Sequence, residues 1–338
     1  MVALCSLTVA EALNTTSFVT LPVYTARART YVAKTESSGL GVFASTDVAR
    51  GELLFREHPL LVYPQMVPFH SFRPPGEQYP ELDDAISKLS ATDRQAFFNL
   101  ANSCPYESSP TKGIIDTNAV HIGLLSGSQA EYAAVCKQLS RVNHSCSPNG
   151  HYHFCPSSLS LELRALQPIS AHTEVTISYV DPTLPRAARL AALASYAFTC
   201  TCPSCSLPES VSPESDARRA FLARTVTDDA ALSRWARDPS LPDAMGALAD
   251  RAYVRACEAE GGLFIEDAWT APIARLVKAC CALEDAPGAR EWARRGRELS
   301  LAFTGEDGGW AEVERWPERT GWWGLRRRAK EAAATAAL

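Results

Sequence analysis

Three cysteines lie within six residues of one another in this chain, and this cluster constrains the fold more than any other feature. The run is Cys200-Thr201-Cys202-Pro203-Ser204-Cys205, a C-x-C-x-x-C pattern. Thiols spaced this closely do not pair easily with one another, but a loop can wrap them around one metal ion. Zinc prefers four such ligands in a tetrahedron, so the pattern predicts a zinc site with one more ligand from elsewhere. The alternative, three free thiols on a loop, would be prone to oxidation.

The fourth ligand is not fixed by the spacing. Cys146, Cys155, His151 and His153 all carry suitable atoms. If residues 150–155 form a strand, the two histidines and Cys155 share one face, where a second metal site is conceivable; we expect a polar strand face instead. A site closed by four thiolates leaves no position for water, so its metal would be structural.

The overall composition is that of a globular chain of about two domains. The 338 residues are 46% hydrophobic and 21% charged, with a net charge of −5, so we expect no direct contact with nucleic acid. No apolar run approaches the roughly 18 residues of a membrane span. The eleven cysteines are odd in number and unevenly spread, which favours a reducing compartment, the nucleus and/or the cytoplasm.

Strand and helix signals alternate along the first 200 residues. Residues 29–63 and 150–180 contain strand-like segments, the second with alternating apolar and polar side chains. Between them, prolines predict a loop at 64–80, and helical spacing predicts mostly helix over 81–140. Pro185 would open a short helix that ends near Ala197.

The composition changes after residue 206. Serine and proline dominate residues 206–215, which predicts a linker. From Ala217 onward, alanine, arginine and leucine at helical spacing predict stacked antiparallel helices. We interpret the basic run Arg326-Arg327-Arg328 as a solvated helix end.

Two segments, residues 47–54 and 168–175, share a pattern of an apolar residue, a turn, a glutamate and an apolar strand. We interpret both as tight connections that enter buried strands. Gly51 suits the positive φ of such a turn, which His172 tolerates less well.

A second dense motif is Asn143-His144-Ser145-Cys146-Ser147-Pro148-Asn149. A polar run bounded by proline predicts a buried loop with a hydrogen-bonding task. Together with residues 39–44, 174–179 and 196–205, in this order, it resembles the SET-domain lysine methyltransferases. The chain is most similar to the branch related to the SET-and-MYND proteins, over about residues 29–206, although no MYND zinc module is visible.

The resemblance implies an α+β fold. A SET-domain β-fold with a pseudoknot would occupy residues 29–181, with a helical insertion at about 64–140, after an N-terminal segment at 1–28. A zinc-bound post-SET segment would follow at 182–208, and an α-helical C-terminal domain at 209–338. The resemblance also assigns the fourth zinc ligand, so that the metal site would consist of Cys146, Cys200, Cys202 and Cys205.

The resemblance further implies S-adenosylmethionine as methyl donor. Gly39, Leu40 and Gly41 would bring the backbone close to this cofactor, although Leu40 and His172 differ from the residues usual in the family. Three further side chains complete the implied cofactor site: Asn143 and His144 at the polar ends of the donor and Phe198 stacked on its adenine.

The acceptor implied by the resemblance is a lysine amine of a protein substrate, histone or non-histone. Tyr179 would lie beside both the cofactor and the transferring methyl group, and Tyr196 would line the lysine channel. Two alternatives remain open at this stage. One is a catalytically inactive SET-fold interaction protein that binds a partner through its helical C-terminal half, and the other is a methyltransferase that acts on a small molecule.

Overall fold

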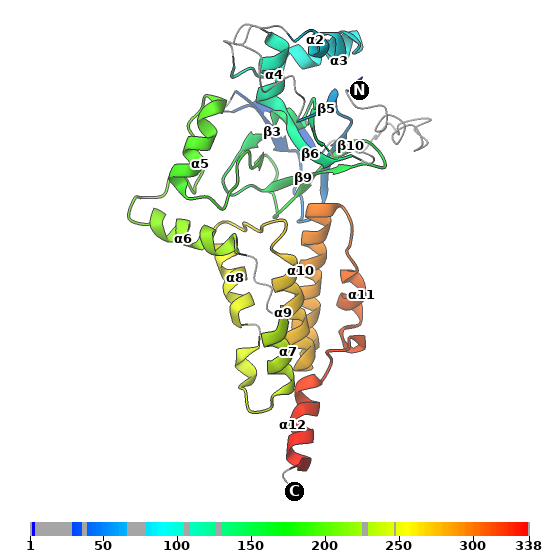
Figure 1. Cartoon of the computed structure of the whole chain (residues 1–338), viewed down its shortest axis with the longest axis vertical. Coiled ribbons are helices and arrows are strands. Elements are labelled where there is room, and N and C mark those ends of the chain that lie inside the picture. The colour runs from blue at the N-terminus through cyan, green and yellow to red at the C-terminus, as the bar shows by residue number, and fades with distance from the viewer. Residues whose placement is uncertain are drawn as a thin grey trace.

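The computed structural model of the chain describes residues 2–3, 29–35, 39–65, 79–104, 109–125, 130–224, 229–246 and 248–336. The predicted N-terminal segment and the proline-rich loop at 64–80 lie mostly outside these residues. A β-rich part with small helices occupies one end of the molecule, and a bundle of helices occupies the other (Figure 1).

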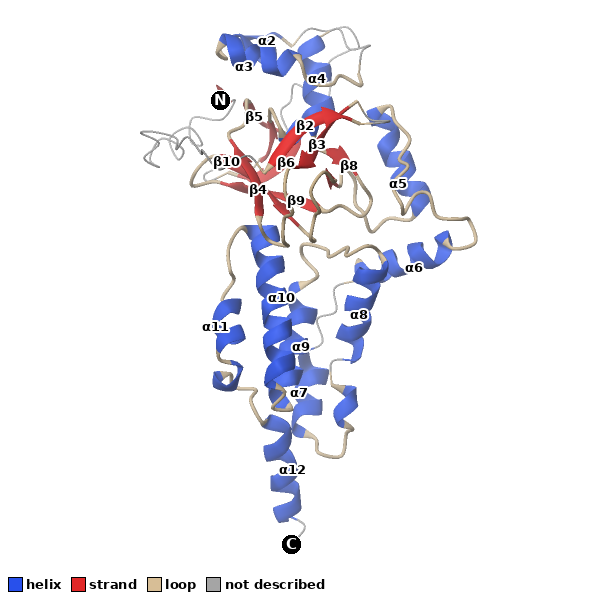
Figure 2. Ribbon diagram, turned by 180° about the vertical axis from the view of Figure 1, so that it is seen from behind, coloured by secondary structure: helices blue, strands red, loops and turns tan. Residues whose placement is uncertain are grey.

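The strands form three small sheets, with the orders β1-β5-β7-β6, β4-β10-β9 and β2-β3-β11-β8. Figure 2 shows these sheets grouped between the small helices and the helical bundle. The apolar residues that alternate in the sequence, such as Leu161, Leu163, Val175 and Ile177, are buried in the core between the sheets. The strands are β1 (Val2–Ala3), β2 (Thr30–Lys34), β3 (Leu40–Ala44), β4 (Leu53–Glu57), β5 (Leu61–Pro64), β6 (Val120–Leu124), β7 (Glu131–Val135), β8 (Asn143–His144), β9 (Gly150–Cys155), β10 (Ser160–Ala165) and β11 (Glu174–Ile177).

The two similar segments of the sequence lie beside each other. Val48 and Ile169 form an antiparallel bridge. The connection before β4 and the connection before β11 therefore lie side by side. Gly51 has a φ of 79° and His172 a φ of 65°, as the turn pattern predicts. His172 accepts the left-handed conformation while its Nδ1 lies 3.2 Å from the hydroxyl of Tyr31.

The segment at 81–140 is only partly helical. It contains α2 (Pro80–Ser87), α3 (Ala91–Phe98) and α4 (Pro110–Asn118), but residues 120–135 form β6 and β7, so the prediction of a mostly helical insertion was wrong there. The physical reason is visible in the sequence. Val120, Ile122 and Leu124 alternate with His121 and Gly123, which is a period of two, and β7 is a short apolar run that is buried on both faces.

The short helix predicted after Pro185 is present. Helix α5 (Arg186–Leu193) continues as one 3-10 turn, Ala194–Tyr196. Ala197 then ends the turn with a left-handed φ of 56°. This reversal directs Phe198 and the cysteine cluster back toward the sheets.

The remaining helices form the bundle. The antiparallel pair α9 and α10 is joined by a short turn and forms its centre (Figures 1 and 2). The C-terminal end of α10 contacts the β-rich part. The backbone of Glu298 in α10 lies close to Gly51, and Gly305, which follows α10, lies beside His153 of β9. The helices are α6 (Ser212–Leu222), α7 (Asp229–Arg237), α8 (Leu248–Ala259), α9 (Thr270–Ala282), α10 (Ala286–Thr304), α11 (Trp310–Arg315) and α12 (Leu325–Ala336).

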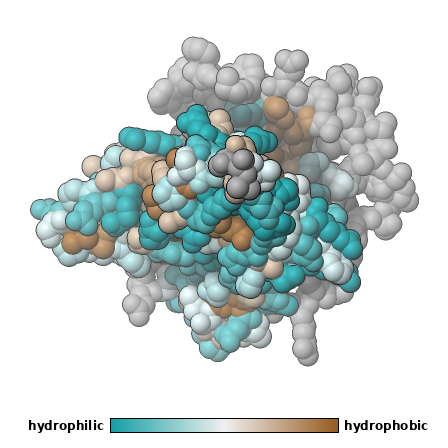
Figure 3. Space-filling view, turned by 90° about the horizontal axis from the view of Figure 1, so that it is seen from below, coloured by the Kyte–Doolittle hydropathy of each residue, from teal (hydrophilic) through white to brown (hydrophobic). Residues whose placement is uncertain are grey.

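The arginine run at the start of α12 is not fully solvated. Arg326 is buried and donates hydrogen bonds to the carbonyl oxygens of Trp235, Asp238 and Leu241. Its neighbours Arg327 and Arg328 are exposed, as the sequence suggested. The end of the molecule around α12 is mostly hydrophilic, with small and separated hydrophobic areas (Figure 3). Within the described ranges, we find no helix with the length and apolar character that crossing a membrane requires.

Candidate functional site

Strand β8 places the polar motif beside the strand that leads to Tyr179. Asn143 and His144 pair in parallel with Thr176 and Ile177 of β11. The side chain of Asn149 also joins the two segments, because it donates to the Glu174 carbonyl oxygen at 2.8 Å and accepts from the Thr176 amide at 2.8 Å. The two segments that the predicted pseudoknot would bring together are therefore adjacent.

A cavity of about 460 Å³ lies at this junction. It is lined by most of the residues expected to bind a cofactor: Gly39, Leu40, Asn143, His144, Tyr179 and Phe198. Tyr196 lines it as well. The insertion contributes a wall that the sequence did not reveal, formed by residues 99–101, Ser103, Thr117 and Asn118. Such contacts cannot be seen in the sequence because they join segments that lie far apart in the chain.

Gly41 lies behind this cavity rather than in its wall. A methyl group on its Cα would lie 2.5 Å from Glu174 Oε1 and 3.0 Å from Asn143 Nδ2. These two atoms belong to a hydrogen bond in which Asn143 donates to Glu174 at 2.7 Å, and Asn143 also donates to the Leu40 carbonyl oxygen at 3.2 Å. Gly41 thus leaves the space in which Glu174 orients Asn143.

His144 connects the candidate metal site with Tyr179. Its Nδ1 accepts a hydrogen bond from the Tyr179 amide at 3.0 Å, so Nε2 carries the proton of the neutral ring. Nε2 lies 3.3 Å from the sulfur of Cys146. Burial lowers the pKa of His144 to about 4, so the ring is neutral at physiological pH.

The rings of Tyr179 and Tyr196 lie next to each other, tilted by 42°. Their ring centroids are 5.0 Å apart, and Phe198 lies 6.5 Å from each ring. The hydroxyl of Tyr179 donates to the Val142 carbonyl oxygen at 2.6 Å. Burial, followed by the neighbouring Tyr196, raises the pKa of Tyr179 above its ordinary range, so the phenol stays protonated.

A second cavity, of about 280 Å³, meets the first at these tyrosines. It shares Tyr179 and Tyr196 with the first cavity and continues toward Gln65, His121 and Tyr152. A third cavity, of about 600 Å³, shares His121 and Tyr152 with the second and extends to the loop between α8 and α9. The three cavities are therefore neighbours, and residues from the candidate cofactor site to the loop before α9 line them.

The four predicted zinc ligands come together. The sulfurs of Cys146, Cys200, Cys202 and Cys205 all lie within 4.8 Å of one another, and those of Cys146 and Cys205 are 3.5 Å apart. Tetrahedral zinc at about 2.3 Å from each sulfur places the sulfurs about 3.8 Å apart, so the four thiols fit this ion. This is the only group of its kind within the described ranges, so neither the two histidines of β9 nor Cys155 joins it.

The histidines of β9 instead face the helical bundle. His151 packs against Phe303 with a centroid distance of 4.8 Å, and its Nε2 lies 3.6 Å from Glu266. His153 lies beside Gly305 and 3.9 Å from Glu162. The expected polar strand face is therefore a contact surface for α10 and the loop that precedes α9.

Comparisons with known proteins agree with this geometry. Residues 39–180 match the SET domain family. The chain is 28% identical over 189 residues to histone-lysine N-methyltransferase set5 of Schizosaccharomyces pombe, which covers 55% of this chain and 54% of that protein. It is 36% identical to protein-lysine N-trimethyltransferase SMYD5 of Gallus gallus over 28% of this chain and 23% of that protein. It is 42% identical to N-lysine methyltransferase SMYD2-A of Xenopus laevis over 22% of this chain and 17% of that protein.

The chain thus spans about half the length of the first of these relatives and less than a quarter of the other two. The matched region contains the junction of β8 and β11, Tyr179 and Cys146. The other three cysteines of the cluster lie after it in the chain. Residues 39–180 therefore match the SET domain, and part of the chain is similar to the lysine methyltransferases set5, SMYD5 and SMYD2-A.

Proposed function

We propose that this protein transfers a methyl group from S-adenosylmethionine to a lysine amine of a protein substrate. One observation carries the proposal: two cavities meet at Tyr179 and Tyr196, which line both of them. Such an arrangement lets a donor and an acceptor enter separately and react where the cavities meet. The names of the relatives, which are lysine methyltransferases, support the same reaction.

The larger cavity is the proposed cofactor site. Asn143 offers its amide and His144 its backbone to a polar ligand, and Phe198 offers an aromatic face to a flat base. When bound, S-adenosylmethionine supplies a methyl group on a positively charged sulfur. Tyr179 lines this cavity, and the partial negative charge of its hydroxyl oxygen would stabilise positive charge on the methyl group.

The smaller cavity is the proposed lysine channel. A lysine amine titrates near ~10.4 in water and must be neutral to attack. The aromatic rings of Tyr152, Tyr179 and Tyr196 line the channel, and a poorly solvated amine in it has a lowered pKa. No carboxylate lines either cavity within the described residues. The proton therefore leaves to solvent before the nitrogen–carbon bond forms and the carbon–sulfur electron pair returns to sulfur.

The third cavity suggests which residues flank the target lysine. Its charged walls are Glu266 and Asp267, beside apolar surface from Ile265 and Phe303. No lysine or arginine lines it within the described ranges. We propose that it accepts a basic side chain of the substrate, close in sequence to the lysine that occupies the channel.

Isothermal titration calorimetry tests the proposed donor site. Zinc-loaded protein should bind S-adenosylmethionine at one site per chain, and Asn143→Ala should weaken this binding. The absence of binding at millimolar donor would contradict the proposal and favour a SET-fold protein that acts only through protein interactions.

A peptide library tests the proposed substrate class. Peptides with arginine or lysine near the target lysine should be methylated faster than peptides with acidic flanks. The double variant Glu266→Gln/Asp267→Asn should lose this preference, whereas Glu312→Gln, an exposed site on α11, should retain it. Equal rates for basic and acidic flanks in the unaltered protein would contradict this part of the proposal.

A further inference from the structure

Two fully buried arginines approach the cysteine cluster from outside the SET domain. Arg189 belongs to α5 and Arg219 to α6, and both side chains have an exposed fraction of 0%. A charged guanidinium removed from water needs opposite charge or a full set of hydrogen bonds. The hydrogen-bond and charge partners of the two arginines therefore indicate their role.

Arg219 uses all five of its N–H groups, and four of them hold the cluster and the segments around it. Nη1 donates to the carbonyl oxygens of Cys146 at 2.8 Å and Pro182 at 2.6 Å. Nη2 donates to the hydroxyls of Ser147 at 2.9 Å and Ser204 at 2.8 Å. One side chain of the helical region thus joins the loop after β8, which contains Cys146 and Ser147, to the segment that contains Ser204.

The fifth N–H of Arg219 anchors this contact in the bundle. Nε donates at 2.9 Å to Glu260, a buried carboxylate that follows α8. Glu260 also accepts from Ser215 and from Arg218, each at 2.7 Å. The Glu260 charge is therefore already shared with Arg218, and it does not by itself neutralise Arg219.

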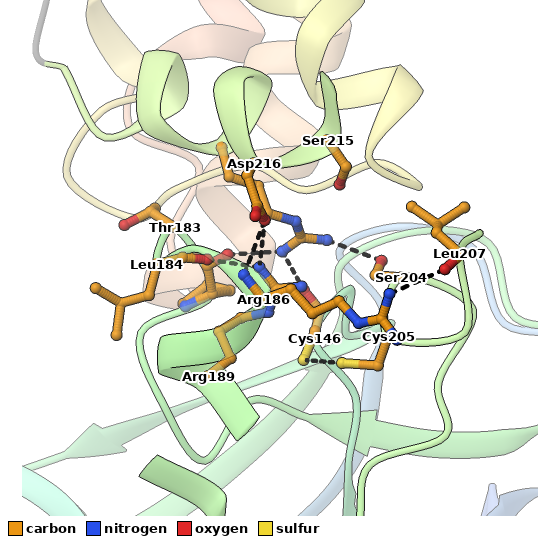
Figure 4. Close-up of polar contacts among 12 residues, drawn as sticks. Cys146, Thr183, Leu184, Arg186, Arg189, Ser204, Cys205, Leu207, Ser215 and Asp216 are labelled. Atoms are coloured by element: carbon orange, nitrogen blue, oxygen red, sulfur yellow. Dashed lines mark hydrogen bonds and ion pairs between the residues drawn. The ribbon is translucent and has the colours of Figure 1, made fainter. Parts of the chain in front are cut away.

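Arg189 is less completely satisfied. Its Nη1 donates to the Leu184 carbonyl oxygen at 2.5 Å and lies 3.7 Å from Asp216 of α6. Its Nε and Nη2 are buried and have no nitrogen or oxygen partner among the described residues. Figure 4 shows the carboxylate of Asp216 directed toward the α5 arginines, with the sulfurs of Cys146 and Cys205 joined close by.

Helix α5 packs on the cysteine cluster through Leu190 and Leu193. The unpartnered Nε and Nη2 of Arg189 are therefore buried on the helix that covers the cluster. Thiolate sulfur is an acceptor for such groups. Four thiolates around one Zn²⁺ leave an excess of two negative charges, and the two buried arginines supply two positive charges next to them.

We propose that Arg189 and Arg219 are the counter-charge of the zinc tetrathiolate and couple metal binding to the docking of α5 and α6 on the SET domain. Zinc holds the four sulfurs as thiolates, and their negative charge compensates for the burial of both guanidiniums. When the metal is removed, the arginines lose this counter-charge. Helix α6 then loosens from the SET domain.

Zinc affinity measured by competition with a chelator tests this proposal without an activity assay. Arg189→Met should weaken zinc binding about 10- to 100-fold, as loss of a group that hydrogen-bonds to metal ligands typically does. Arg189→Lys keeps the charge and should retain most of the affinity. Arg219→Met should weaken zinc binding in the same range.

Arg275→Met is the matched control. Arg275 is also buried, with an exposed fraction of 3%, but it pairs with Asp250 inside the bundle and is not in contact with the cysteines. This variant should bind zinc as the unaltered protein does. Unchanged affinity in Arg189→Met, or an equal loss in Arg275→Met, would overturn the proposal.

Hydrogen exchange of the whole 338-residue chain provides the second readout. Chelation of zinc should speed exchange in α6 at least about tenfold and leave α12, at the far end of the bundle, unchanged. Exchange in α6 that does not respond to chelation would overturn the coupling. Both readouts are independent of methyl transfer, so their failure would leave the proposed function standing.

Discussion

Gly41 occupies a crowded backbone position beside the candidate site. Its missing side chain makes room for the hydrogen bond between Asn143 and Glu174. Gly41→Ala should displace one of these two groups, at about 1–3 kcal/mol of local overpacking, and lower the affinity for S-adenosylmethionine at least about tenfold. Calorimetry checks this, with Gly321→Ala as control, because a methyl group there meets nothing within 4 Å. Unchanged affinity in Gly41→Ala would contradict the orienting role of Glu174.

Individual residues also show where the sequence was sufficient and where it was not. Asn143, His144, Tyr179 and Phe198, which the resemblance assigns to the cofactor, line one cavity. Their binding of the cofactor stays a prediction. Glu174 was visible only as part of a strand motif, because its contact with Asn143 joins positions 31 residues apart. The burial of Arg189, Arg219 and Arg326 has no local signature, since an arginine on a helix is solvated or buried according to what packs over it.

At the scale of elements, the cysteine cluster joins two segments that are distant in the chain. Cys146 follows β8, whereas Cys200, Cys202 and Cys205 belong to the segment that carries Tyr196 and Phe198. Zinc content by elemental analysis should be near one per chain and should fall sharply in Cys146→Ser. Cys155→Ser, in a thiol outside the cluster, is the control. A zinc content that does not change in Cys146→Ser would reassign the fourth ligand.

Helices and strands were predictable from the sequence where apolar residues repeat with one clear period. The alternation in β10 and β11 and the helical spacing in α2 and α3 were sufficient. The β6–β7 pair was missed because β7 is a buried apolar run, Tyr132-Ala133-Ala134-Val135, that fits a helix as well as a strand. Its pairing with β5 makes it a strand, and the paired residues are separated in the sequence by about half the length of the SET domain.

For the whole molecule, the contact between the SET domain and the bundle contains a half-buried histidine, His151. Burial, together with His153, lowers the pKa of His151 to about 4, whereas an unfolded histidine titrates near ~6.5. Between these values only the unfolded chain binds the proton, so the free energy of unfolding decreases as the pH falls from 6.5 toward 4. The loss from this residue at pH 5 is about 1–2 kcal/mol.

Urea unfolding at pH 7 and pH 5 measures this contribution. His151→Phe should lose less stability between the two pH values than the unaltered protein does. His121→Gln should behave like the unaltered protein, because the His121 side chain is 50% exposed. Equal pH dependence in His151→Phe and the unaltered protein would show that His151 titrates normally at this contact.

The central claim concerns the meeting point of the two cavities, and mass spectrometry of lysine methylation tests it most directly. The protein is incubated with S-adenosylmethionine and a mixture of cellular proteins, and methylated lysines are counted against those formed by Tyr179→Phe. The unaltered protein should produce methyl-lysine at defined sites, and the variant should be at least about 100-fold slower while it still binds the donor. Methyl-lysine formed equally by both proteins, or by neither despite donor binding, would contradict the account.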